Sequence, residues 1–73
     1  MARALAGAGA AADAAGDARG AADLFLRAGR SALLAGGQAS AAEDWLVQAE
    51  RLARAAGDRA ILEQVAALRA RGA

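Results

Sequence analysis

Apolar residues recur along most of this chain at spacings of three and four residues. The clearest example is the stretch SAAEDWLVQAERLARAAGD at residues 40–58, in which the charged residues fall between the apolar ones. This spacing places the apolar side chains on one stripe of an α-helix. The sequence has few β-branched residues and no alternation of apolar and polar residues, which are the signals of strands. The pattern therefore predicts an all-α fold.

Residues that typically begin and end helices divide this pattern into segments. Ser40 with Glu43 three residues later has the sequence of a capping box, in which each side chain binds a free backbone N–H group. Gly57 can adopt the left-handed conformation that ends a helix. Asp17 and Asp58 each follow a glycine and are predicted to cap the next helix. Together these signals predict four helices, over residues 3–15, 18–35, 40–56 and 59–71.

The chain also resembles itself at an offset of 21 residues, which indicates an internal repeat. Under this offset Gly16, Ala21, Phe25 and Ala28 meet Gly37, Ala42, Leu46 and Ala49. The alanines allow neighbouring helices to approach closely, while Phe25 and Leu46 fill the gaps between turns. Gly29 costs about 1 kcal/mol relative to alanine in a helix, so it predicts an especially close crossing. The short connections predict antiparallel helical hairpins.

These repeat positions resemble the second helix of a tetratricopeptide repeat. That family has a glycine before the helix, a small residue within it, a large apolar residue four positions later and an alanine three further on. The Ala- and Arg-rich sequence is also similar to the helical repeats of large bacterial LuxR-type regulators and signal-transduction ATPases. Successive matches lie 21 residues apart, whereas the family's period is about 34, and the chain has no proline. The resemblance implies tetratricopeptide-like hairpins stacked as a short piece of right-handed solenoid.

At 73 residues the chain has room for one small domain, which we take to span residues 1–73. Residues 1–15 are expected to form a weakly ordered first helix, because Leu5 is the only large apolar residue of that predicted helix. Residues 16–58 match the family pattern best, and residues 59–73 are expected to form the final helix.

The composition leaves little material for a core. Alanine accounts for 27 residues, and only 14 larger apolar side chains remain besides Met1. Small domains often gain stability from disulfides, metal ions or association, and this chain has neither cysteine nor histidine. We therefore expect it to associate with a second copy, with neighbouring repeats or with another protein.

The residues that catalysis requires are scarce. The chain has no His, Cys, Lys, Tyr or Thr and only two serines, Ser31 and Ser40. The adjacent carboxylates of Glu43 and Asp44 project about 100° apart around a helix, so we interpret them as part of a solvated face. The Gly-rich runs lack the Lys and Ser/Thr of a phosphate-binding loop. We predict that the chain is not an enzyme and binds no cofactor or metal.

Nine arginines and eight acidic residues give a net charge of +1. So small a charge provides no long-range attraction to nucleic acid or anionic membranes. The sequence has no apolar run of the roughly 18–20 residues that a membrane span requires, and its N-terminal stretch lacks the apolar core of a signal peptide. The absence of cysteine fits a reducing compartment. We expect a cytoplasmic protein without a membrane partner.

Trp45 has two interpretations. Its ring lies either at the edge of the core between helices or in an apolar surface that meets a neighbour or a peptide, because interfaces favour Trp. Val47 and Leu26 lie off the main apolar stripes, which indicates a second apolar face on these helices. We therefore take Trp45, Val47 and Leu26 as candidate partner-binding residues, with a protein or peptide as the partner.

These observations predict a non-catalytic protein-interaction or scaffold module, and two alternatives stay open. The resemblance to regulator repeats allows the chain to be a fragment of a multidomain bacterial transcriptional regulator. The stretch LARAAGDRAILEQVAAL has the helix, turn and helix of a small DNA-binding motif. Against that reading, Asp58 stands where such motifs generally have an apolar residue, and the second helix has few polar side chains for reading bases.

Overall fold

The computed structural model describes residues 2–36 and 39–72, and within them it contains four α-helices and no strand. The helices are α1 (Ala2–Ala14), α2 (Ala18–Ala35), α3 (Ala39–Ala56) and α4 (Arg59–Gly72). The all-α prediction and the four predicted helices are confirmed, and each helix end lies within one residue of its predicted position.

Local signals explain the first and last connections. Gly16 and Gly57 have φ angles of +84° and +69°, in the left-handed region that ends a helix at low cost for glycine. The backbone N–H of Gly20 donates to Asp17 Oδ1 at 2.9 Å, and that of Ile61 donates to Asp58 Oδ1 at 3.1 Å. Both predicted aspartate caps are therefore confirmed.

The predicted capping box at the start of α3 is wrong. The helix begins at Ala39, so Ser40 lies inside the first turn rather than before it. Alanine has the highest helix propensity, which explains why the helix extends through Ala39. Glu43 does not reach back to the helix start, and its Oε1 instead accepts a hydrogen bond from Arg69 Nη2 of α4 at 3.1 Å.

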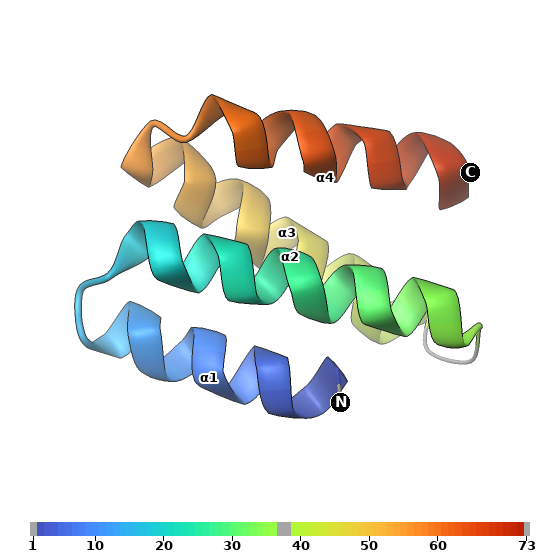
Figure 1. Cartoon of the computed structure of the whole chain (residues 1–73), viewed down its shortest axis with the longest axis horizontal. Helices are drawn as coiled ribbons and strands as arrows, with labels where there is room; N and C mark the ends of the chain where they lie inside the picture. The colour runs from blue at the N-terminus through green and yellow to red at the C-terminus, as the bar shows by residue number, and fades with distance from the viewer. Residues whose placement is uncertain (1, 37–38, 73) are drawn as a thin grey trace.

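Consecutive helices run in opposite directions, and α3 lies behind α2 in the view of Figure 1. The central helix is α2, because it contacts each of the other three. Its most extensive contact is with α3 and its next is with α1, whereas its contact with α4 is smaller. The helix α4 also packs against α3. The molecule measures 31 × 23 × 13 Å along its principal axes.

Small side chains form the closest part of the core, between α2 and α3. Six alanines of these helices are completely buried, at 0% exposure: Ala21, Ala22, Ala28, Ala42, Ala49 and Ala53. At Gly29 a Cβ atom would lie 2.7 Å from Leu46 Cδ2 and 3.4 Å from the carbonyl oxygen of Ala42. A side chain at this point would force Leu46 to shift. The close crossing predicted at Gly29 is therefore confirmed.

The first helix, α1, packs onto α2 through small residues as well. Its buried residues are Ala2, Ala6 and Gly9. The ring of Phe25 lies against Gly9, where a Cβ atom would be 3.0 Å from Phe25 Cδ2. Leu5 is partly buried against the same core. The weak order expected of this helix stays a prediction.

Candidate protein-interaction surface

The three residues predicted to bind a partner do not form one surface. Leu26 is only 2% exposed and belongs to the main core, so its assignment to an outward apolar face is corrected. The reason is that α2 is contacted by all the other helices, which cover both of its apolar faces. Trp45 is partly buried and packs against both apolar clusters of the core. Of the three residues, only Val47 is exposed, at 46%.

The repeat positions serve the packing of the helices rather than a binding site. Phe25 and Leu46 are 8% and 2% exposed, and both belong to the main core. The alanines of the repeat are fully buried, and Gly16 ends α1. Gly37 lies outside the described residues. The residues that repeat at an offset of 21 are thus the ones that let α2 approach α3 and α1.

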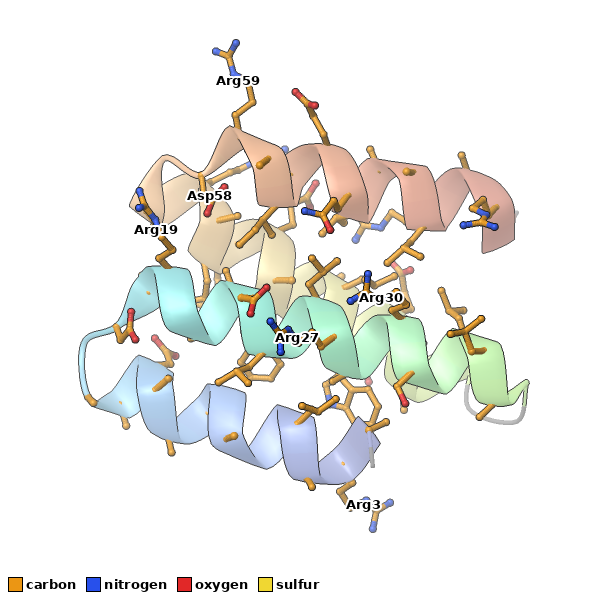
Figure 2. The ribbon with its side chains drawn as sticks, in the orientation of Figure 1. Arg3, Arg19, Arg27, Arg30, Asp58 and Arg59 are labelled. Carbon is orange, nitrogen blue, oxygen red and sulfur yellow. The ribbon has the colours of Figure 1, made fainter. Side chains whose placement is uncertain are left out.

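A groove runs between α2 and α4, and its end near the C-termini of these helices is apolar and basic. A hollow of about 340 Å³ there is lined by Leu33 and Leu34, by Leu68, and by Arg30 and Arg71. Leu34 is 84% exposed. Figure 2 shows Arg30 extending from α2 towards α4. This site was missed in the sequence, because it is made by two helices that do not follow one another in the chain.

The other end of the groove has a different charge pattern. It is lined by three aspartates, Asp17, Asp23 and Asp58, together with Arg19. These groups are already engaged within the chain: Arg19 pairs with Asp58 at 3.7 Å, and Arg27 pairs with Asp23 at 3.0 Å. Within residues 2–36 and 39–72, neither Arg30 nor Arg71 takes part in an ion pair. The basic end therefore presents two arginines that no described carboxylate neutralises.

The exposed strip of α3, formed by Glu43, Asp44 and Val47, carries charge of the opposite sign to the basic end of the groove. Val47 lies one turn after Glu43 and Asp44, and all three are exposed. Glu43 pairs with Arg69, whereas Asp44 forms no ion pair with any described residue. Arg51, one turn further along, is paired with Asp13 of α1 at 3.6 Å. The strip thus combines an aliphatic side chain with an available carboxylate.

A cluster of charges joins α4 to α3. Arg69 Nη2 lies 3.1 Å from Glu43 Oε1, and Arg69 Nη1 lies 3.3 Å from Glu50 Oε2. Arg54 also contacts Glu50, at 3.5 Å. The Nε atom of Arg69 is buried and has no hydrogen-bond partner among the described residues. This cluster was not predicted, because Glu43 and Arg69 are 26 residues apart in the chain.

The described parts of the chain contain no group of three acidic side chains placed to hold a metal ion. None of the helices in those parts combines the length and the hydropathy that crossing a membrane requires.

Comparisons of the chain with models of protein families, with curated proteins and with solved structures found no match in any of the three.

Proposed function

We propose that this chain is a non-catalytic protein-interaction or scaffold module. In this proposal its helices pair as tetratricopeptide-like hairpins that stack as a short piece of right-handed solenoid. Such modules bury one helix face inside the stack and leave other faces for neighbouring units or for partners.

One observation carries the proposal: the alanines and the large apolar residues that repeat at an offset of 21 residues lie where the helices meet. The alanines at these positions are fully buried, and Leu46 fills the space that Gly29 leaves open. Two successive helices thus use the same arrangement of small and large residues to pack. Repetition of a packing arrangement in consecutive helices is typical of stacked units.

The surface supports a role in binding. Among the described residues two large apolar side chains are exposed, Leu34 and Val47. A single exposed aliphatic residue is ordinary in a folded protein. Leu34, however, lies beside Leu33 and Leu68 in the hollow between α2 and α4, and together they form an apolar patch with basic edges.

Selection of ligands from a displayed library of peptides tests the proposal, together with sedimentation of the isolated chain. We expect enriched ligands that bind the folded chain in calorimetry, self-association of the chain, or both. The variant Leu46→Ala, in which the core is damaged, provides the control for binding that requires the fold. The absence of both an enriched ligand and self-association at concentrations up to about 1 mM would contradict the proposal.

A further inference from the structure

We propose that the partner of this module is a second copy of the same chain, in which the exposed strip of α3 enters the groove between α2 and α4. In this contact Val47 of one copy fills the hollow beside Leu34 of the next, and Asp44 pairs with Arg30 and Arg71. The inference rests on the proposed function, since it names the protein that the interaction module binds.

The first step concerns the two exposed aliphatic side chains. Leu34 and Val47 are 84% and 46% exposed, and each leaves apolar surface in water. Covering such surface is worth roughly 25 cal/mol per Å². A hollow of about 340 Å³ has room for one or two side chains but not for a folded domain. A single valine that projects from a helix fits this space.

The second step concerns charge. Each exposed aliphatic residue has available charges about one turn earlier in its own helix, and the two sets have opposite signs. Arg30 precedes Leu34 by four residues, and Asp44 precedes Val47 by three. At a rise of 1.5 Å per residue these offsets are about 6 Å and about 4.5 Å along the helix axes. When α3 of one copy runs parallel to α2 of another, Val47 meets Leu34. The carboxylate of Asp44 then meets the guanidinium of Arg30.

Unpaired arginines beside apolar surface favour this pairing over other contacts between two copies. Five of the nine arginines are paired with a described carboxylate: Arg19, Arg27, Arg51, Arg54 and Arg69. Of the remaining four, Arg3 and Arg59 point away from the helices in Figure 2. Only Arg30 and Arg71 line an apolar hollow. A guanidinium beside apolar surface favours a carboxylate partner, because the ion pair there is less screened by water.

The third step concerns geometry. The helix α3 lies behind α2 in Figure 1 and also packs against α4, so the groove opens on the side away from α3. At about 100° per residue, Asp44 and Val47 lie on the side of α3 roughly opposite its buried residues Ala42, Leu46 and Ala49, so the exposed strip faces away from α2 and from the groove. The strip of one molecule therefore cannot reach the groove of the same molecule. Two copies also cannot each place a strip in the other's groove, because the strip and the groove lie on opposite sides of the molecule. The contact is head to tail, which adds copies one after another.

Sedimentation of the full chain and of two variants tests the inference. We expect the chain to associate as its concentration rises, and the association to weaken at high salt because ion pairs contribute to it. The variant Arg30→Glu with Leu34→Ser removes the groove, and Asp44→Arg with Val47→Ser removes the strip. Each should weaken self-association by about tenfold or more. All four residues are exposed, so circular dichroism should show helicity close to that of the unchanged chain.

The decisive measurement is an equal mixture of the two variants. The groove variant still carries an intact strip, and the strip variant still carries an intact groove, so the mixture should form heterodimers and stop at that size. The variant Arg3→Glu, which changes one arginine in the same way on a remote helix, should associate as the unchanged chain does.

Three results would overturn the inference: a monomeric chain at all concentrations, variants that still associate, or a mixture that stays monomeric. If the chain is monomeric but binds selected peptides, the proposed function stands and only the identity of the partner is wrong. If the chain is monomeric and no peptide is selected, both proposals fail.

Discussion

The contact between α2 and α3 and the contact between α3 and α4 are built differently. Small residues bring α2 and α3 close together, so that Leu46 lies directly over Gly29. The helix α4 is attached by a few larger residues, Ile61 and Val65, and by the ion pairs of Arg69. Exposed ion pairs contribute little to stability, whereas close apolar contact contributes much more. The difference indicates that α2 and α3 form the stable unit and that α4 is held more weakly.

Of the variants that test this difference, Leu46→Ala should have the largest effect on the free energy of unfolding. Leu46 is 2% exposed and fills the space above Gly29, so its truncation leaves a cavity that the rigid backbones around it cannot close. We expect the free energy of unfolding to fall by about 2–5 kcal/mol, measured by urea denaturation with circular dichroism. Val47→Ala, one residue further along, should change it by less than about 0.5 kcal/mol. Similar losses for the two variants would mean that α2 and α3 do not meet at Leu46.

The next test compares two glycines within helices. A Cβ atom at Gly29 would lie 2.7 Å from Leu46 Cδ2, whereas at Gly7 it would meet nothing within 4 Å. Gly7→Ala should raise the free energy of unfolding by about 0.5–1 kcal/mol through helix propensity. Gly29→Ala should lower it by about 1 kcal/mol, because overpacking exceeds the gain in propensity. In thermal melts, the melting temperature should rise for Gly7→Ala and fall for Gly29→Ala. Shifts of the same sign would contradict the close crossing of α2 and α3.

The start of α4 provides a smaller test. Asp58 accepts a hydrogen bond from the N–H of Ile61 and also pairs with Arg19 at 3.7 Å. Asp58→Ala should lower the free energy of unfolding by about 1 kcal/mol through loss of the cap. Asp58→Asn keeps the cap and removes only the charge, so it should cost no more than a few tenths of a kcal/mol. Equal losses in urea denaturation would assign the effect to the ion pair rather than to the cap.

The parts of the fold that the sequence predicted depend on neighbouring residues. The caps at Asp17 and Asp58 and the turn at Gly57 are made by groups a few positions apart. The close crossing at Gly29 was also predicted, because a glycine in a strongly helical segment is costly unless something requires the space.

The errors and omissions have physical causes. The capping-box pattern of Ser40 and Glu43 predicts the wrong helix start, because it takes no account of the helix propensity of Ala39, which extends α3 by one residue. The position of Leu26 off the main stripe predicts an outward apolar face, because the pattern within one helix does not show that three helices contact α2. Likewise, the groove that contains Arg30 and Arg71 requires α2 and α4 to lie side by side. No periodicity within one helix contains that information.

The smallest test concerns the ion pairs that hold the C-terminal half of α4. Arg69 bridges Glu43 and Glu50 of α3, and its side chain is 32% exposed. We expect Arg69→Gln to lower the free energy of unfolding by only about 0.5 kcal/mol, because partly exposed ion pairs are screened by water. Hydrogen exchange should nevertheless become faster in α4 while the amides of α2 and α3 keep their protection. Arg59→Gln, at the exposed start of the same helix, is the control and should leave α4 unchanged. Uniformly faster exchange in all helices would show that α4 unfolds only together with the rest of the chain, and the difference between the two contacts would then have no dynamic consequence.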